Sequence, residues 1–296
     1  MDLTLRNTSG RRVFKELTGA TNHFLITILI GLDGVEKGTV CKAPEFSTSW
    51  NAKDPSASAR RSREFALSSG LAWVVDALDS YFISLRRVPS VVENASVRRA
   101  FDGAGRSVTN RLNLMLDSFL VQRERAELSR LAIAWRNVLV HSFSDDQFCD
   151  SARTYLTSQG PALHAGFRGL DIAVLLNRFD RREAPSFKEA LSLISALHLL
   201  VSELDERLLS QLDPLRFFSD ALHLYLAQDP IGRAQNVWGK GDDKARKTLR
   251  VLLSQAGFSP ADDLVRPRVT ADDIDAIAQL SPKEACARFV SGYTVA

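Results

Sequence analysis

The fold of this chain is decided by residues 128–141, whose sequence is LSRLAIAWRNVLVH. Apolar side chains recur there every three or four positions, at Leu128, Leu131, Trp135 and Leu139. This period predicts an α-helix that buries one face against other helices. The same spacing returns on both sides of the stretch, so the predicted fold class is mainly α.

Two further long helices are predicted around it. The apolar residues between 58 and 85 follow the helical period, and so do those between 187 and 208. The second of these helices is preceded by a capping box, Ser186 to Glu189, in which the two side chains can satisfy free backbone N–H groups. Residues 88–106 contain proline and glycine and predict a break or a short helix.

The expected organisation has three parts. Residues 58–226 form an antiparallel helical bundle, residues 1–57 an N-terminal segment, and residues 227–296 a C-terminal helical region. In the last part, a helix over 242–255 is closed by Gly257. Thr270, followed by two aspartates, and the sequence from Ser281 to Glu284 are typical of helix starts.

The N-terminal segment predicts a small β-hairpin. Phe24–Ile30 is rich in β-branched residues, Asp33 and Gly34 form a turn signal, and Gly38–Cys41 can return as a second strand. The same apolar run is also compatible with a buried helical turn, because periodicity does not separate the two at this length. Residues 43–58 are expected to be a connecting loop.

Composition excludes few functions. The net charge of +3 is too small to indicate nucleic-acid binding. Arginine outnumbers lysine, which suits phosphate contacts but is explained equally well by a GC-rich genome. The three cysteines lie far apart, so neither a disulfide framework nor a zinc site is expected. The chain also contains no Gly-x-Gly-x-x-Gly and no His-Glu-x-x-His motif, and we expect no cofactor.

The sequence indicates a protein of the cytoplasm. Residues 1–12 lack the layout of a signal peptide, and the apolar run Phe24–Leu32 is too short to cross a bilayer. We therefore expect no membrane partner.

Three polar residues near the end of the central helix could carry chemistry. They are Arg136, Asn137 and His141. At roughly 100° per residue, Arg136 and His141 lie about 140° apart around an ideal helix. Their side chains converge only if the helix distorts near His141 or if a second subunit completes the site. Residues 142–146 are typical of a helix end.

An arginine, a polar residue directly after it and a histidine five positions on resemble the motif of the HEPN superfamily. The resemblance implies a helical bundle that forms a homodimer, with the two motif helices facing one another. It also implies cleavage of RNA without a metal ion, in which the 2′-hydroxyl attacks the adjacent phosphate. In that chemistry His141 would exchange a proton, since histidine titrates near neutral pH, and Arg136 would stabilise the phosphorane. Asn137 would orient the substrate or the histidine.

The resemblance also implies a biological setting and an alternative. The setting is bacterial defence or a toxin, with an antitoxin or another regulatory protein as a partner. Some members are regulated at a tyrosine two places after the histidine, and here that position is Phe143, which has no hydroxyl to modify. Because inactive members occur, the alternative is a non-catalytic helical module that binds RNA or protein in the same groove.

Several arginines are weak candidates for RNA contacts. Arg60, Arg61 and Arg63 lie at the start of the first long helix, and Arg181 and Arg182 lie in a polar loop. Clusters of this kind are more often solvated surfaces than binding sites.

Simpler interpretations of the motif remain open. His141 could cap the C-terminus of its helix, and Arg136 could form a surface ion pair. The chain also contains a looser match to the motif, Arg216 with His223. It lacks the polar residue after the arginine, and we treat it as a chance match.

Overall fold

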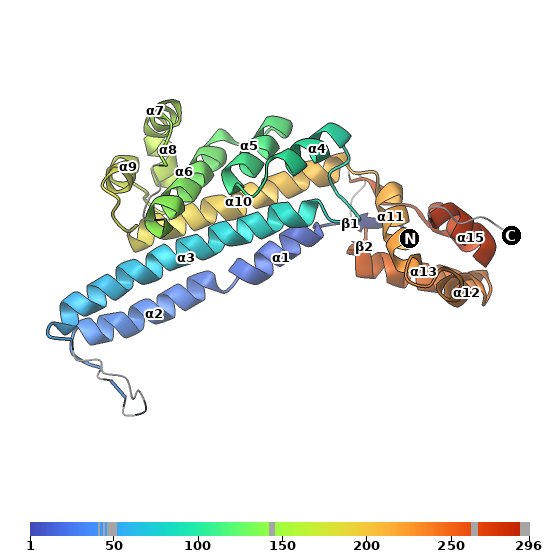
Figure 1. Ribbon diagram of the computed structural model, residues 1–296, viewed down its shortest axis with the longest axis horizontal. Helices are drawn as coiled ribbons and strands as arrows, with labels where there is room; N and C mark the ends of the chain where they lie inside the picture. Colours follow the sequence, from blue (N-terminus) through green and yellow to red (C-terminus); the bar gives the residue numbers. More distant parts are fainter. Residues whose placement is uncertain (41, 44, 46–51, 142–145, 262–265, 291–296) are drawn as a thin grey trace. The chain divides into compact units, whose positions relative to one another are not determined.

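A computed structural model describes residues 1–40, 42–43, 45, 52–141, 146–261 and 266–290 (Figure 1). These residues are mainly helical and include a small antiparallel sheet, which confirms the predicted fold class at this level. The chain forms two compact units that alternate along the sequence. We call them the motif unit, with Val13–Ser80 and Ser107–Glu203, and the sheet unit, with Met1–Arg12, Tyr81–Arg106 and Leu204–Ala296. The division into parts at residues 57 and 226 stays a prediction.

The motif unit is built from long helices with shorter ones around them. It holds α2 (Thr21–Glu36), α5 (Val108–Ser118), α6 (Arg123–Val140), α7 (Asp150–Ser158), α8 (Gly160–Gly166), α9 (Ile172–Asp180) and most of α1 (Ser9–Thr18), α3 (Pro55–Leu85) and α10 (Phe187–Gln211). The three long helices predicted from apolar spacing are therefore confirmed as α3, α6 and α10.

The core of this unit joins helices that are far apart in sequence. Leu29 of α2, Leu67 of α3 and Ala190 of α10 form one buried cluster. On α6, Trp135 is fully buried, packs edge-on against Phe179, and donates a hydrogen bond from its indole nitrogen to a backbone carbonyl. The predicted apolar stripe is therefore the buried face of α6.

The predicted hairpin is wrong and its helical alternative is confirmed, because Phe24–Ile30 lies within the helix α2. Figure 1 shows α2 beside α3, and Leu25 packs so closely on Gly70 that a Cβ there would lie 2.9 Å from its methyl groups. Leu25 and Leu29, four residues apart, are buried on one face of α2, as a helix requires. A β-branched run therefore forms a helix here because tertiary packing overrides a weak local preference.

The expected return strand and loop are only partly described. Residues 37–40 follow α2 without forming a strand, and Cys41 lies outside the described residues. Of the predicted loop over 43–58, residues 44 and 46–51 also lie outside the described residues, and residues 55–58 belong to α3, so the predicted end of the loop is wrong. Within the part of the chain that the structure describes, no helix is both long and apolar enough to cross a bilayer.

The sheet unit combines the two ends of the chain. Its elements are β1 (Leu3–Leu5), α4 (Ala95–Gly103), α11 (Pro214–Leu226), α12 (Pro230–Trp238), α13 (Asp242–Ala256), β2 (Phe258–Pro260), β3 (Arg268–Val269), α14 (Ala271–Ala278) and α15 (Pro282–Phe289). The strand order is β2-β1-β3, and both pairings are antiparallel. β1 is therefore the central strand, with partners more than 250 positions later in the chain.

The predicted helix boundaries are confirmed where local capping defines them. Ser186 and Glu189 exchange side-chain and backbone hydrogen bonds at the start of α10. Thr270 and Ser281 form capping boxes for α14 and α15. Gly257 ends α13 in the left-handed conformation, with φ of 104°.

Candidate functional site

The motif lies where α6 emerges from the buried core. Most positions of the helix from Ala126 to Trp135 are buried, those from Arg136 to Leu139 are half-buried, and Val140 is exposed. His141 is the residue after the helix, with an extended backbone (φ −109°, ψ 104°), and it is exposed. Its backbone N–H donates to the Asn137 carbonyl at 2.9 Å. The predicted end of the helix is confirmed, because α6 ends at Val140. Residues 142–145, including Phe143, lie outside the described residues.

Arg136 is held against α3 by a loose ion pair. One terminal nitrogen of its guanidinium lies 3.4 Å from a carboxylate oxygen of Asp76. The arginine side chain is only 13% exposed, whereas the Asp76 side chain is 70% exposed. The Nε of Arg136 is buried and makes no hydrogen bond. The guanidinium therefore keeps unused donor capacity, and its one carboxylate neighbour is largely in water.

Asn137 points to a different partner. Its amide nitrogen donates to a carboxylate oxygen of Asp146, which ties the end of α6 to the segment that leads into α7. Within the described residues, no hydrogen bond or ion pair joins Arg136, Asn137 and His141 through their side chains. In one copy of the chain, the side chains of Arg136 and Asn137 instead contact two different carboxylates.

A cavity of about 620 Å³ adjoins the motif end of α6. Val138 of α6 lines it, together with Asp146, Arg153, Asp180 and Arg182. Arg153 is a bidentate partner of Asp180, with one contact at 3.0 Å. Asp150 also lines the cavity, so three carboxylates face two guanidiniums. A phosphate entering here would compete with carboxylates already in place.

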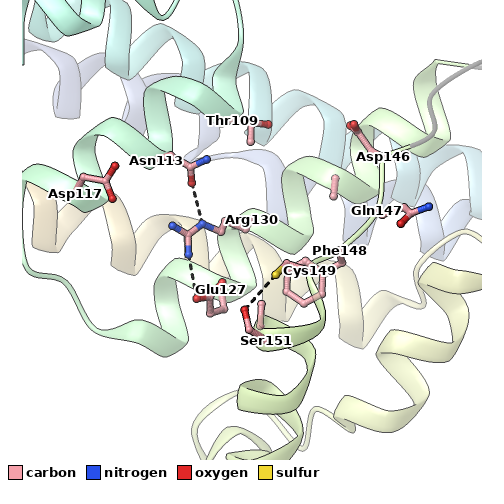
Figure 2. A pocket seen from close by; sticks show the side chains of 12 residues that line it. Thr109, Asn113, Asp117, Glu127, Arg130, Asp146, Gln147, Phe148, Cys149 and Ser151 are labelled. Carbon is pink, nitrogen blue, oxygen red and sulfur yellow. Dashed lines mark hydrogen bonds and ion pairs between the residues drawn. The ribbon is translucent and has the colours of Figure 1, made fainter.

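A second cavity, of about 460 Å³, lies beside the same segment (Figure 2). A polar chain lines it, in which Arg130 donates to Asn113 at 2.9 Å and to Glu127 at 3.0 Å. Glu127 is buried, and its second carboxylate oxygen makes no hydrogen bond. Sequence spacing contains no signal for this cavity, because its residues come from α5, α6, α7 and the segment that leads into α7.

Cys149 lines the second cavity and is a candidate that the sequence analysis missed. It is the N-cap of α7, is exposed, and its sulfur lies 3.1 Å from the Ser151 hydroxyl (Figure 2). The hydrogen bond to Ser151, followed by contacts with the first amides of α7, lowers the pKa of the Cys149 thiol. Thiols at helix N-termini gain reactivity in this way. Recognising the start of α7 would have identified it.

The weaker RNA candidates lie in two places, near the start of α3 and just after α9. Arg60 and Arg63 lie 3.6 and 3.5 Å from Glu36, and Arg61 is exposed. At 1.5 Å per residue, they lie about 20 Å along α3 from Asp76, the partner of Arg136. Arg181 pairs with a carboxylate at 3.0 Å. Of the predicted set, only Arg182 lines the cavity beside the motif.

The chance match of Arg216 with His223 lies in the sheet unit, where both residues have structural contacts. Arg216 contacts Glu93 at 3.3 Å and Asp220 at 3.1 Å. The imidazole of His223 lies 2.7 Å from the Phe289 carbonyl oxygen.

The described residues contain no group of three or more histidine, cysteine or acidic side chains that could hold a metal ion. Comparison of the chain with protein-family models, with curated proteins and with solved structures finds no match.

Proposed function

We propose that this chain is a metal-independent endoribonuclease of the HEPN type, with a composite site at a homodimer interface. One observation carries the proposal. The last turn of α6 leaves the core and ends at an exposed histidine, five residues after an arginine with unused donor groups. The motif therefore occupies a surface position at a helix end, as a site for a large substrate requires.

The proposed reaction is an internal transfer at phosphorus. The 2′-oxygen of RNA attacks the adjacent phosphorus, and the bond from phosphorus to the 5′-oxygen breaks. His141 takes the proton of the 2′-hydroxyl or protonates the leaving 5′-oxygen, while Arg136 offsets the charge on the phosphorane. Asn137 orients the reacting groups. The products are a 2′,3′-cyclic phosphate and a 5′-hydroxyl.

The proposed dimer is consistent with the contacts of one copy, in which no hydrogen bond or ion pair of the described residues joins the three side chains. Arg136 contacts Asp76 of α3, and Asn137 contacts Asp146. His141 lies beyond the end of α6 and is exposed. In the proposed dimer, the histidine of one copy and the arginine of its partner act on the same phosphate. The resemblance places such an enzyme in bacterial defence or in a toxin, under a regulatory partner.

A specific observation favours a second candidate function. Carboxylates contact both Arg136 and Asn137, and three carboxylates line the adjoining cavity. Such a surface suits a cationic protein segment better than RNA. In this alternative the chain is a non-catalytic binding module that uses the same groove.

The deciding experiment compares variants on a mixed RNA pool in the presence of a chelator. His141→Ala should reduce the rate of cleavage by about 10²- to 10⁴-fold, the usual contribution of general acid–base catalysis. Because His141 is exposed, the variant should keep the wild-type melting temperature. His164→Ala is the matched control, since His164 is an exposed histidine of the same unit, and its activity should equal that of wild type.

Three results separate the candidates. Cyclic phosphate ends from wild type and His164→Ala, but not from His141→Ala, support the nuclease. Equal cleavage by His141→Ala rejects the site. Absence of cleavage by wild type at every pH, with retained binding of a protein partner, favours the binding module.

A further inference from the structure

The motif unit carries an exposed apolar groove between α2 and α3. Its volume is about 760 Å³, and Leu17, Phe24, Ile28, Phe65 and Trp73 line it. Of these, Phe24 is 61% exposed, Ile28 47%, Phe65 76% and Trp73 53%. The largest contiguous apolar patch of a monomeric protein is typically about 300–600 Å² and often marks an interaction site.

The groove contains almost no charge. No acidic or basic residue occurs from residue 17 to residue 32, apart from His23, and none occurs from residue 65 to residue 75. Charged side chains lie at its margins, where Glu16 is one of the lining residues. Depletion of charge with aromatic enrichment is typical of the centre of a protein–protein interface. Membrane-surface helices instead carry lysine and arginine on their polar face, and α2 has none.

The area of the groove matches a dimer interface. Four bulky side chains of roughly 200 Å² each, exposed to the fractions above, leave on the order of 500 Å² of apolar surface. A standard interface takes about 800 Å² from each partner, of which slightly more than half, about 450 Å², is apolar. The groove alone supplies that apolar share.

We propose that a second copy of this chain occupies the α2–α3 groove and forms a two-fold symmetric dimer. Two-fold homodimers are the commonest oligomers, and each copy then presents the same self-complementary surface. Trp73 at the edge of the groove lies three residues before Asp76, so both share one face of α3. Asp76 is the ion-pair partner of Arg136. A partner seated on the groove therefore lies next to the motif.

The inference rests on the proposed function only in that both require a dimer. Its test measures the mass of the protein without RNA, so the two can fail separately. A dimer without nuclease activity rejects the proposed function alone. A monomer that cleaves RNA rejects this inference together with the composite site.

The test compares two isoleucines of one helix by sedimentation equilibrium over a micromolar concentration series. Ile28 lines the groove and is 47% exposed, whereas Ile26 is 45% exposed and is absent from the groove lining. Two positions along a helix correspond to about 200° of rotation, so they face opposite sides. Ile28→Glu should raise the dimer Kd at least about 100-fold, because the substituted residue occurs twice in the interface of a two-fold symmetric dimer. Phe65→Glu should do the same, and Ile26→Glu should leave the Kd within about threefold of wild type.

Several results would overturn the proposal. They are a monomeric wild type at every concentration, an unchanged Kd in both groove variants, and equal losses in Ile26→Glu and Ile28→Glu. Flotation of a monomeric wild type, but not of Ile28→Glu, with phosphatidylglycerol vesicles would assign the groove to lipid instead. Below the wild-type dimer Kd, the unfolding temperature of each variant should stay near that of wild type, because the substituted side chains are exposed in the single chain.

Discussion

At the scale of single residues, burial decides which charged groups are structural. Asp205 is fully buried in the sheet unit and accepts hydrogen bonds from the backbone and the hydroxyl of Thr8. Arg11 lies 3.8 Å from its carboxylate. Burial raises the pKa of Asp205, and the two hydrogen bonds from Thr8 offset this only in part. Asp205 connects the N-terminus of α1 to α10 by hydrogen bonds. Its protonation state therefore affects the stability of the fold and not the proposed site.

This raised pKa predicts a pH-dependent contribution to stability. A carboxyl that binds its proton more tightly in the folded chain stabilises the fold at low pH, and this contribution is lost as pH rises from about 3.8 through the folded pKa. Asp205→Asn cannot titrate. The substitution should lower the free energy of unfolding by about 1–3 kcal/mol near pH 4, because one hydrogen-bond acceptor of the side chain is lost. Near pH 7 the loss should be smaller. Urea unfolding at both pH values measures the difference between the two proteins, and a cost that grows with pH would contradict this account.

The motif residues show what sequence can and cannot give at this scale. The arginine, asparagine and histidine are visible in the sequence, and so is the helix end at His141. Their partners are not visible, because Asp76 lies on α3 and Asp146 beyond the end of α6. The same holds for Asn113 of α5, which accepts a hydrogen bond from Arg130 of α6 in the second cavity. Cavities are formed by residues from several elements, and one-dimensional spacing carries no information on them.

At the scale of elements, boundaries set by local chemistry could be predicted. The capping boxes of α10, α14 and α15 and the glycine after α13 depend on residues within four positions of each other, so the sequence contains the whole interaction. The identity of α2 could not be predicted this way. Its β-branched residues favour a strand locally. Contacts with Gly70 and Leu67, some 40 positions later, instead stabilise a helix.

The glycine after α13 supplies a prediction about a helix end. Gly257 has φ of 104°, a conformation that side chains with a Cβ rarely adopt, and a Cβ there would lie 3.1 Å from a methyl group of Leu5. Gly257→Ala should therefore reduce the free energy of unfolding by about 1–2 kcal/mol. Gly103→Ala is the control, because Gly103 lies at the end of α4 without positive φ, and a Cβ added there would meet no atom within 4 Å. It should be neutral or slightly stabilising, and chemical denaturation that ranks the two variants in the reverse order would contradict the argument.

At the scale of the whole molecule, the sequence predicted helices but not how distant segments combine. The sheet was missed because its central strand has three residues and its partners lie at the other end of the chain. No spacing rule detects a pairing over such a separation. For the same reason, the two units could not be predicted, since each is assembled from segments that alternate along the sequence.

The pairing of the two ends leads to a prediction for the sheet unit. Leu3 pairs with Pro260 and Val269, Leu5 pairs with Phe258, and both leucines are buried. Replacing both with alanine removes the apolar contacts of the central strand, from which β2 and β3 on either side receive their hydrogen bonds. Because each buried leucine contributes about 2–5 kcal/mol, the double variant should lose at least about 4 kcal/mol of stability.

Hydrogen exchange measured by mass spectrometry shows which segments are affected and by how much. In the double variant, the amides of β2 and β3 should exchange faster, because a central strand that no longer packs releases both neighbours at once. Val251→Ala is the control, since it also shortens an apolar side chain of the sheet unit, but one that is 54% exposed on α13. Its stability should stay within about 0.5 kcal/mol of wild type. Unchanged exchange in β2 and β3 of the double variant would show that the C-terminal segment folds without the N-terminal strand, and would reject the sheet as the link between the two ends of the chain.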